Sequence, residues 1–170
     1  MVGSGGAGKS TLSRNLSEIL NLPIYHLDNY FWEPGWQMAD TNKWLKINNE
    51  LINEEKWIID GNFKSTMSNR LEAADTIIFL DIKRIVCLLN AWKRYYKYRN
   101  KRRPDLAKGC FEKIDFKYYK WIWGYPKRSR DNTIKCINMF GKEKKIIILK
   151  SIKEIKQFVY SLKHLKVLQP

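Results

Sequence analysis

Gly3-Ser4-Gly5-Gly6-Ala7-Gly8-Lys9-Ser10, at the start of the chain, fits the pattern G-x-x-x-x-G-K-[ST] of a phosphate-binding P-loop. Glycines allow consecutive backbone N–H groups to point into one concavity, where they bind the oxygens of an anion. In this pattern the lysine reaches the β- and γ-phosphates, and the serine hydroxyl binds Mg²⁺. We therefore predict a site for ATP and Mg²⁺, in which Lys9 is catalytic and Ser10 is a metal ligand. The predicted nucleotide-binding residues of this stretch are Gly3, Ser4, Gly5, Gly6, Ala7, Gly8, Lys9, Ser10 and Thr11.

Short apolar segments alternate with helical patterns after the loop, which is typical of an α/β protein with parallel strands. Expected strands are 24–28, 57–60, 76–81 and 146–149, and expected helices are 11–20, 41–55, 65–73, 85–98, 115–125 and 151–162. Ser151 and Glu154 form a candidate capping box for the last helix. Only Met1 and Val2 precede Gly3, so the first strand is either very short or begins before the given sequence.

The composition indicates one soluble globular domain over residues 1–170, since 44% of the 170 residues are hydrophobic and no apolar run approaches the ~20 residues of a membrane span. Cys87, Cys110 and Cys136 lie far apart, with neither the spacing of a zinc site nor the even number of a disulfide framework. We predict a cytoplasmic protein with no membrane partner.

Three expected strands are followed by or end in aspartate, at Asp28, Asp60 and Asp81. Ligands bind at the carboxyl ends of parallel strands, so these carboxylates are expected near the P-loop. By chain order Asp60 is the predicted carboxylate for Mg²⁺, and Asp28 is predicted to orient or deprotonate the phosphate acceptor. Asp81 is interpreted as structural, and so is His26.

The net charge of +15 is concentrated between residues 93 and 130, which hold 14 Lys/Arg and three acidic residues. The segment 99–115 is placed where a mobile lid would lie, and Arg99 and Arg103 are predicted to neutralise the migrating phosphoryl group, with Arg102 at the nucleotide. The alternative is that this charged run is a solvated surface. Ten aromatic residues interleave with it, which also suits weak nucleic-acid binding.

Aromatic residues in 29–40 form either an acceptor pocket or part of the core, and Trp32 and Trp36 are the candidates for stacking on a flat substrate. Further candidates for binding the phosphate acceptor are Gly61, Arg70 and Arg128.

Several blocks of the sequence together resemble one family: Gly3–Ser10, His26-Leu27-Asp28, Trp32–Trp36, Trp57–Asn62, Arg70-Leu71, Ala74–Asp81 and Arg102–Asp105. They are similar to bacterial P-loop proteins known as DNA topology modulation proteins, which are adenylate-kinase-like. This resemblance implies a three-layer P-loop NTPase fold with a five-stranded parallel sheet of order 2-3-1-4-5, helices on both faces and a basic helical lid. It also implies ATP binding and kinase-like activity. This chain has Asn90 where the family tends to have an arginine near the nucleotide base, and Lys93 and Arg94 are the two candidate substitutes.

Two functions from different classes follow. The first is a Mg²⁺-dependent kinase that transfers the γ-phosphate of ATP to a small molecule or nucleotide. The second is a nucleotide-regulated DNA-binding protein that affects DNA topology without small-molecule kinase activity. A protein that binds nucleotide without turnover is a third reading.

Overall fold

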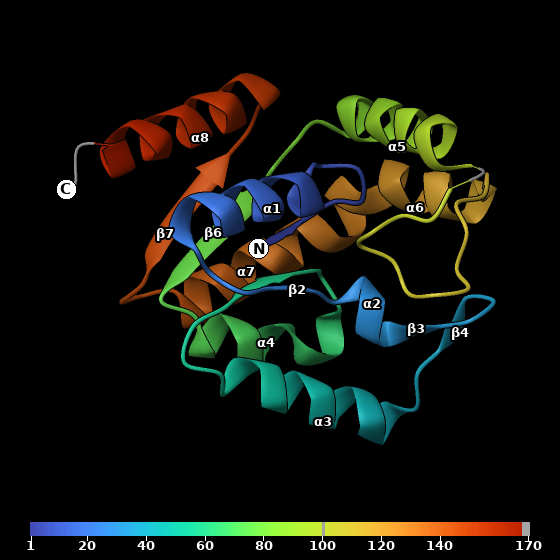
Figure 1. The fold of residues 1–170 in the computed structure, drawn as a ribbon, viewed down its shortest axis with the longest axis horizontal. Coiled ribbons are helices and arrows are strands. Elements are labelled where there is room, and N and C mark those ends of the chain that lie inside the picture. The colour runs from blue at the N-terminus through green and yellow to red at the C-terminus, as the bar shows by residue number, and fades with distance from the viewer. Residues whose placement is uncertain (100, 168–170) are drawn as a thin grey trace.

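The computed structural model describes residues 1–99 and 101–167 of the chain, and it is an α/β protein (Figure 1). Its strands are β1 (Val2–Gly3), β2 (Ile24–His26), β3 (Trp32–Glu33), β4 (Gln37–Met38), β5 (Ile58–Asp60), β6 (Thr76–Leu80) and β7 (Lys145–Leu149). Its helices are α1 (Lys9–Leu20), α2 (Asp28–Phe31), α3 (Thr41–Ile52), α4 (Lys64–Ala73), α5 (Arg84–Tyr98), α6 (Phe116–Tyr125), the π-helix η1 (Pro126–Arg130), α7 (Asp131–Phe140) and α8 (Ile152–Val167).

The strands form three small sheets, so the expected five-stranded parallel sheet of a P-loop NTPase fold is wrong. One sheet has the order β1-β6-β7 and is parallel throughout, with Val2 opposite Phe79 and Ile77 opposite Ile146. A second sheet pairs β2 with β5 in parallel, and a third pairs β3 with β4 antiparallel. The alternation of strands and helices in the sequence therefore predicted the class correctly and the sheet incorrectly.

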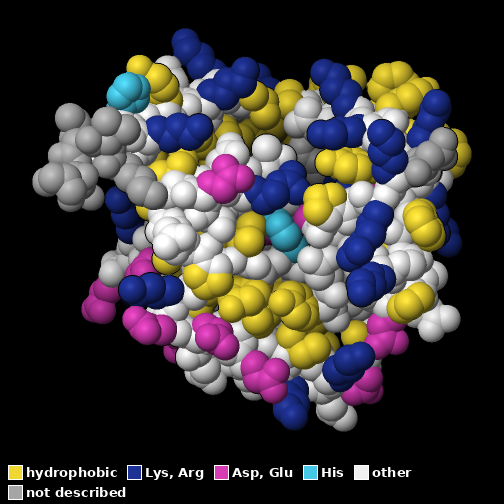
Figure 2. Space-filling view, viewed as in Figure 1, with side chains coloured by type: hydrophobic (Ala, Val, Ile, Leu, Met, Phe, Trp, Pro, Cys, Tyr) yellow, Lys and Arg dark blue, Asp and Glu magenta, His cyan; other side chains and the backbone are white. Residues whose placement is uncertain are grey.

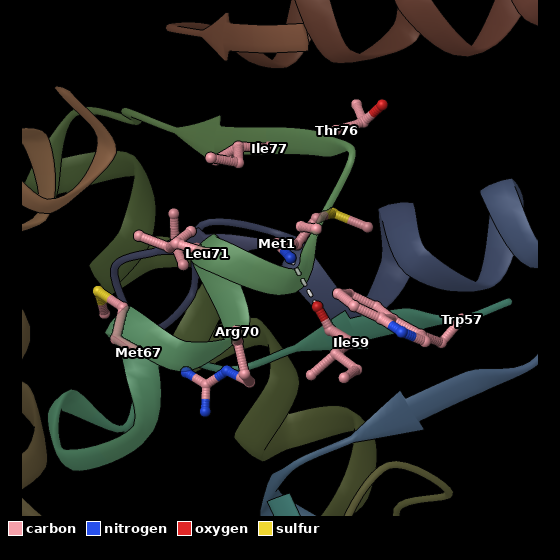
Figure 3. Close-up of a pocket in the computed structure, with 10 residues that line it drawn as sticks. Met1, Trp57, Ile59, Met67, Arg70, Leu71, Thr76 and Ile77 are labelled. Carbon is pink, nitrogen blue, oxygen red and sulfur yellow. Dashed lines mark hydrogen bonds between the residues drawn. The ribbon is translucent and has the colours of Figure 1, made fainter. Parts of the chain in front are cut away.

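The contacts around β1 show how the first two sheets meet. The amino group of Met1 donates a hydrogen bond to the carbonyl oxygen of Ile59 at 2.6 Å (Figure 3), and Gly61 N–H donates to the carbonyl oxygen of Met1 at 3.3 Å. At Gly3 the partner is a side chain: Asn62 accepts from Gly3 N–H at 2.9 Å and donates to its carbonyl oxygen at 2.7 Å. The Asn62 amide thus takes the backbone groups that an adjacent strand would pair, and β1 is too short to extend the ladder.

A small cavity of about 30 Å³ lies beside this junction, lined in part by Trp57, Met67, Arg70 and Leu71 (Figure 3). This volume is about that of one water molecule, so the cavity is too small for a substrate.

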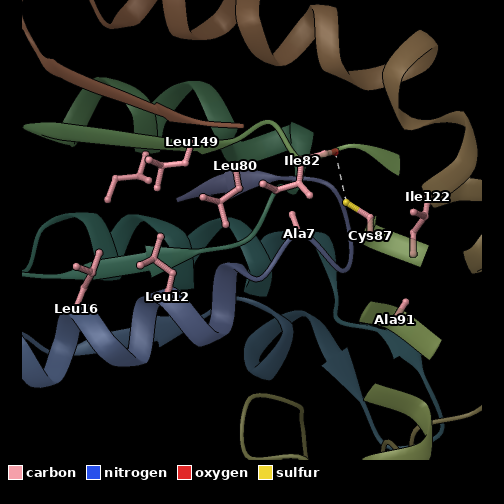
Figure 4. Packing of buried hydrophobic residues seen from close by; sticks show 10 residues of the cluster. Ala7, Leu12, Leu16, Leu80, Ile82, Cys87, Ala91, Ile122 and Leu149 are labelled. Atoms are coloured by element: carbon pink, nitrogen blue, oxygen red, sulfur yellow. Dashed lines mark hydrogen bonds between the residues drawn. The ribbon is translucent and has the colours of Figure 1, made fainter. Parts of the chain in front are cut away.

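The largest hydrophobic cluster anchors the glycine loop (Figure 4). Leu12 and Leu16 of α1 pack with Leu80 of β6 and Leu149 of β7, and Ala7 of the loop itself is fully buried in the same cluster. Figure 1 shows α1 and α8 together beside β6 and β7, while α3 and α4 lie at the opposite side of the molecule. The glycine loop is therefore held by the pairing of Gly3 with Leu80 at its start and by the packing of Ala7 and α1 at its end.

Three regions differ from the sequence-based expectation. The segment 29–40, for which no helix or strand is expected, contains most of α2 and the hairpin β3–β4. Residues 131–140, which we left unassigned, form α7, and its residue Ile137 is buried against β6 residues such as Phe79. The segment 101–115 contains turns and bends but no helix, so the expected helical lid is wrong. Among the described residues, none of the helices has the length and apolar character required to cross a bilayer.

Candidate functional site

The glycine loop has the concave backbone that anion binding requires. Gly8, with φ 97°, lies in the left-handed region immediately before α1 begins at Lys9. Gly6 has φ 74°, and a Cβ atom there would lie 2.1 Å from the carbonyl oxygen of Cys87 on α5. Glycine is therefore required at Gly6 both by the backbone angle and by the approach of α5. The positive end of the α1 helix dipole points at the space that this loop encloses.

Lys9 lies over the loop. Its Nζ atom donates to the carbonyl oxygens of Gly3 and Ser4, both at 3.0 Å. Burial lowers the pKa of Lys9, while the neighbouring carboxylates Asp60 and Asp28 act in the opposite direction. Within the described part of the chain, the ammonium group therefore has no carboxylate as a direct hydrogen-bond partner, and it is held by neutral carbonyl groups that a phosphate could replace.

Asp60 lies at the end of β5, close enough to Lys9 for the two charges to influence each other. Its Oδ2 atom accepts hydrogen bonds from Nδ1 of His26 at 2.7 Å and from Oγ of Ser13 at 3.3 Å. Burial alone would raise the pKa of Asp60, but the His26 hydrogen bond and the charge of Lys9 together hold it below its ordinary value. Asp60 is therefore an ionised group, fixed in orientation by two partners from β2 and α1.

Asp28, the first residue of α2, forms an ion pair with Arg103, with 3.5 Å between its Oδ2 and Nη2 of the arginine. Its side chain is 42% exposed, whereas the side chain of Arg103 is only 4% exposed. Desolvation raises the pKa of Asp28 above its ordinary value, while the charges of Arg103 and Lys9 act in the opposite direction. These are the properties of a group that could orient an acceptor hydroxyl.

Arg103 is the centre of a buried ion-pair network. Its guanidinium group contacts Glu112, and its Nε lies 3.2 Å from Oδ1 of Asp105. Glu112 also lies 2.9 Å from Nε of Arg94 on α5. The segment 101–115 is therefore folded down onto the site, where two arginines are neutralised by carboxylates of that same segment.

Asp105 connects this segment to α1. It lies 3.5 Å from Nη1 of Arg14, and the pKa of Asp105 is lowered because Arg103 and a hydrogen bond from Ser10 outweigh the effect of burial. Ser10, our predicted Mg²⁺ ligand, thus has Asp105 as a neighbouring carboxylate, and the role of Asp60 as a metal ligand stays a prediction.

The hairpin β3–β4 supports the segment 101–115 from the other side. Gly35 N–H donates to the carbonyl oxygen of Gly109 at 3.2 Å, and Nε1 of Trp36 donates to the carbonyl oxygen of Phe111 at 3.1 Å. Trp32 and Trp36 pack edge to face with ring centroids 5.5 Å apart. The acceptor-stacking role of both tryptophans stays a prediction, and their contacts in this structure are with each other and with the segment.

Other predicted site residues have contacts within the protein. Arg70 is buried and donates to the carbonyl oxygens of Gly61 and Asn62 and to the side chains of Asn48 and Thr66, which is a structural arrangement. Arg128 donates to the carbonyl oxygen of Trp121 at 3.0 Å. Arg99 lies over the ring of Tyr96 at 5.4 Å, near the end of α5, and Arg102 is exposed. Among the described residues, no hydrogen bond or ion pair joins these arginines to Lys9, and their roles at the site stay predictions.

Asp81 accepts hydrogen bonds from Nε and Nη2 of Arg130, both at 2.7 Å. This bidentate pair ties the end of β6 to η1, in keeping with the structural interpretation of Asp81.

Sequence reasoning missed several residues that shape the site. Asn90 Nδ2 donates to the carbonyl oxygen of Gly6 at 3.0 Å, so the residue that departs from the family pattern contacts the loop directly. The hydroxyl group of Tyr118 lies against Gly5, where it would be 2.4 Å from an added Cβ, and it accepts a hydrogen bond from Arg94 at 3.3 Å. Glu112 carried only a weak signal, as one of three acidic residues among 14 basic ones.

No group of three His, Cys, Asp or Glu side chains within the described part of the chain is arranged to hold a metal ion. Mg²⁺ in nucleotide sites is held by one or two protein ligands and by the phosphates, so Ser10 with a neighbouring carboxylate is the donor set that the chain offers.

A scan of the sequence against protein-family models found no match, and a search of curated proteins found none either.

Proposed function

We propose that the protein is an ATP-binding phosphotransferase that transfers the γ-phosphate to a small molecule or nucleotide. The observation that carries this proposal is the position of Lys9: its ammonium group lies 3.0 Å from two loop carbonyl oxygens at the start of α1, next to the ionised Asp60. A concave glycine loop, a lysine and a helix N-terminus together form a site for polyphosphate.

The residues divide into roles by their surroundings. The backbone of residues 3–8 and Lys9 would hold the β- and γ-phosphates, and Ser10 would bind Mg²⁺, which supplies charge neutralisation between the phosphates. Asp28, which is half-exposed, would orient the acceptor hydroxyl or accept its proton. Arg103 and Arg94 would stabilise the charge on the phosphoryl group once phosphate oxygens replace Glu112 and Asp105 as their partners.

A transfer assay tests the proposal. The full chain, with Mg²⁺ and ATP labelled in the γ-phosphate, is incubated with a panel of nucleoside monophosphates, nucleosides and phosphorylatable metabolites. We expect labelled product from at least one class, and a loss of at least 100-fold in Lys9→Ala, because Lys9 is the cation at the transferred group. Lys153→Ala, an exposed lysine on α8, is the control and should retain full activity. ATP binding without product from any acceptor would reduce the function to nucleotide binding, and the absence of both would contradict the proposal.

The DNA-binding alternative rests on the charge between residues 93 and 130. It predicts affinity for DNA that falls steeply with salt. No contact among the described residues favours DNA binding over a solvated surface for this charged segment. A cytoplasmic location also stays a prediction.

A further inference from the structure

A row of large apolar side chains on α5 faces outward. Ile85, Leu89, Trp92 and Tyr96 are 60%, 52%, 50% and 51% exposed, and they are separated by four, three and four residues. This spacing places them on one face of the helix and is the spacing of a packed helix seam. The buried face of α5 is narrow and consists of small residues, Cys87 and Ala91. The periodicity of α5 therefore describes a surface that no other element of the described residues covers.

A groove runs beside this row, between α5 and α6. It has a volume of about 830 Å³ and is lined by Leu88, Leu89, Trp92, Ile114, Phe116, Tyr119, Lys120 and Trp123. Phe116 is 85% exposed, Ile114 is 49% exposed and Trp123 is 48% exposed. The guanidinium group of Arg84 lies 3.9 Å above the ring of Trp123, so the two helices are in contact at this end.

We propose that this α5–α6 face is the interface of a homodimer, in which the row of α5 of each copy packs into the α5–α6 groove of the other. The four row residues together with Ile114, Phe116 and Trp123 define the face. At about 200 Å² for a whole large side chain, their exposed fractions amount to on the order of 800 Å². Such an area exceeds the roughly 300–600 Å² of the largest apolar patch on a typical monomer. It is close to the approximately 800 Å² that each partner buries in a standard stable complex.

The composition of the face fits a protein interface core better than a small-molecule site. All seven residues that define it are uncharged, and four are Trp, Tyr or Phe, the types that are enriched at the centre of interfaces. Small-molecule pockets place several polar groups among apolar walls. Here the polar groups are the ammonium of Lys120 and the hydroxyl of Tyr119.

The positive charge of α5 and α6 allows an experiment to tell a second copy of the chain from an anionic partner. Helices α5 and α6 carry Arg84, Lys93, Arg94, Lys97, Lys117 and Lys120 and no acidic residue. Two such faces repel each other, so added salt should strengthen a homodimer by screening the repulsion. Nucleic acid or an acidic lipid surface would be attracted by the same charges, and salt would weaken that binding. The sign of the salt effect therefore identifies the occupant.

The experiment is sedimentation velocity of the full chain from 1 to 100 μM, in 0.05 M and 0.5 M NaCl. We expect a species of twice the 20.3 kDa of one chain, with a dissociation constant that falls severalfold at the higher salt. Trp92→Glu and Leu89→Glu should each raise the dissociation constant by at least about 100-fold, since the two-fold arrangement repeats each change. Met139→Glu places the same charge at a residue of α7 that is 71% exposed, and it should change the constant less than twofold. Circular dichroism checks that all variants are folded.

Three results would overturn the proposal. The first is a wild-type chain that stays monomeric at 100 μM in 0.5 M NaCl. The second is a dimer that Trp92→Glu and Leu89→Glu leave intact. The third is a monomer that binds a 20-nucleotide single strand or vesicles of acidic lipid through Trp92, with affinity that falls with salt, because the face would then serve an anionic partner. None of these results depends on ATP binding, so the phosphotransferase proposal is tested separately.

Discussion

At the scale of residues, the site is a set of balanced charges at short distances. Lys9 is held by two carbonyl oxygens and lies near Asp60, while Arg94 and Arg103 share Glu112. Buried ion pairs contribute little net stability, but removal of one partner leaves an uncompensated charge. The residues around the loop are therefore sensitive to single substitutions that remove charge without changing shape.

Glu112→Gln tests the network. Glutamine keeps the shape and one acceptor oxygen but leaves Arg94 and Arg103 without a shared negative charge, so we expect a loss of about 3 kcal/mol in the free energy of unfolding. Tripolyphosphate, which supplies negative charge to the same arginines, should stabilise the variant more than the wild type in urea denaturation. Glu54→Gln, an exposed residue after α3, should be neutral. A loss below about 0.5 kcal/mol in Glu112→Gln would mean that the network does not hold the segment 101–115.

Asp60 makes stability depend on pH in the acidic range. Its pKa in the folded protein is below the ordinary 3.8, so its stabilising effect is complete above that value and is lost as the pH falls through the folded pKa. In urea unfolding between pH 6 and pH 2.5, we expect the stability difference between wild type and Asp60→Asn to be constant above about pH 4.5 and to shrink below pH 4. A difference that stays the same down to pH 2.5 would contradict an ionised, hydrogen-bonded Asp60.

At the scale of elements, some segments could be predicted from the sequence and others could not, for identifiable reasons. The helix after the loop and the capping box of α8 are confirmed, since Ser151 Oγ accepts from Glu154 N–H at 3.2 Å and donates to its carboxylate at 2.9 Å. Helix α7 was missed although Ile134 and Ile137 have helical spacing, because polar residues separate them. The four expected strands are confirmed, the hairpin β3–β4 was not expected, and apolar runs do not encode which strands pair.

The glycine loop allows a matched test of its packing. Gly6 and Gly35 have nearly the same φ, 74° and 77°, but only Gly6 has a close neighbour for a Cβ, the carbonyl oxygen of Cys87. We expect Gly35→Ala to cost about 1–2 kcal/mol through the left-handed backbone alone. Gly6→Ala should cost at least about 2 kcal/mol more because α5 must move. Thermal unfolding of both variants measures the difference, and equal losses would show that α5 does not press on the loop.

At the scale of the whole molecule, the sheets and the charges were the least predictable features. The junction between β1-β6-β7 and β2-β5 consists of backbone hydrogen bonds at Met1 and of the Asn62 side chain at Gly3, and no periodicity reveals such contacts. Figure 2 shows Lys and Arg side chains over the upper and right parts of the molecule, with acidic side chains gathered toward the side where α3 lies. A run of charges in the sequence suggests solvated side chains, yet Arg103 of that run is buried. The sequence marks Arg103 as a candidate for the site, but its burial and its carboxylate partners Asp105 and Glu112 become visible only in the fold.

The central claim is that residues 3–10 bind a triphosphate through Lys9, and calorimetric titration with a non-hydrolysable ATP analogue and Mg²⁺ tests it most directly. We predict one site per chain in the wild type and an affinity at least tenfold lower in Lys9→Ala, since a hydrogen bond to a charged group contributes about 1.5–3 kcal/mol. Adenosine, which lacks phosphates, should bind neither protein detectably. A wild-type chain that does not bind the analogue, or a Lys9→Ala variant that binds it equally well, would contradict the account.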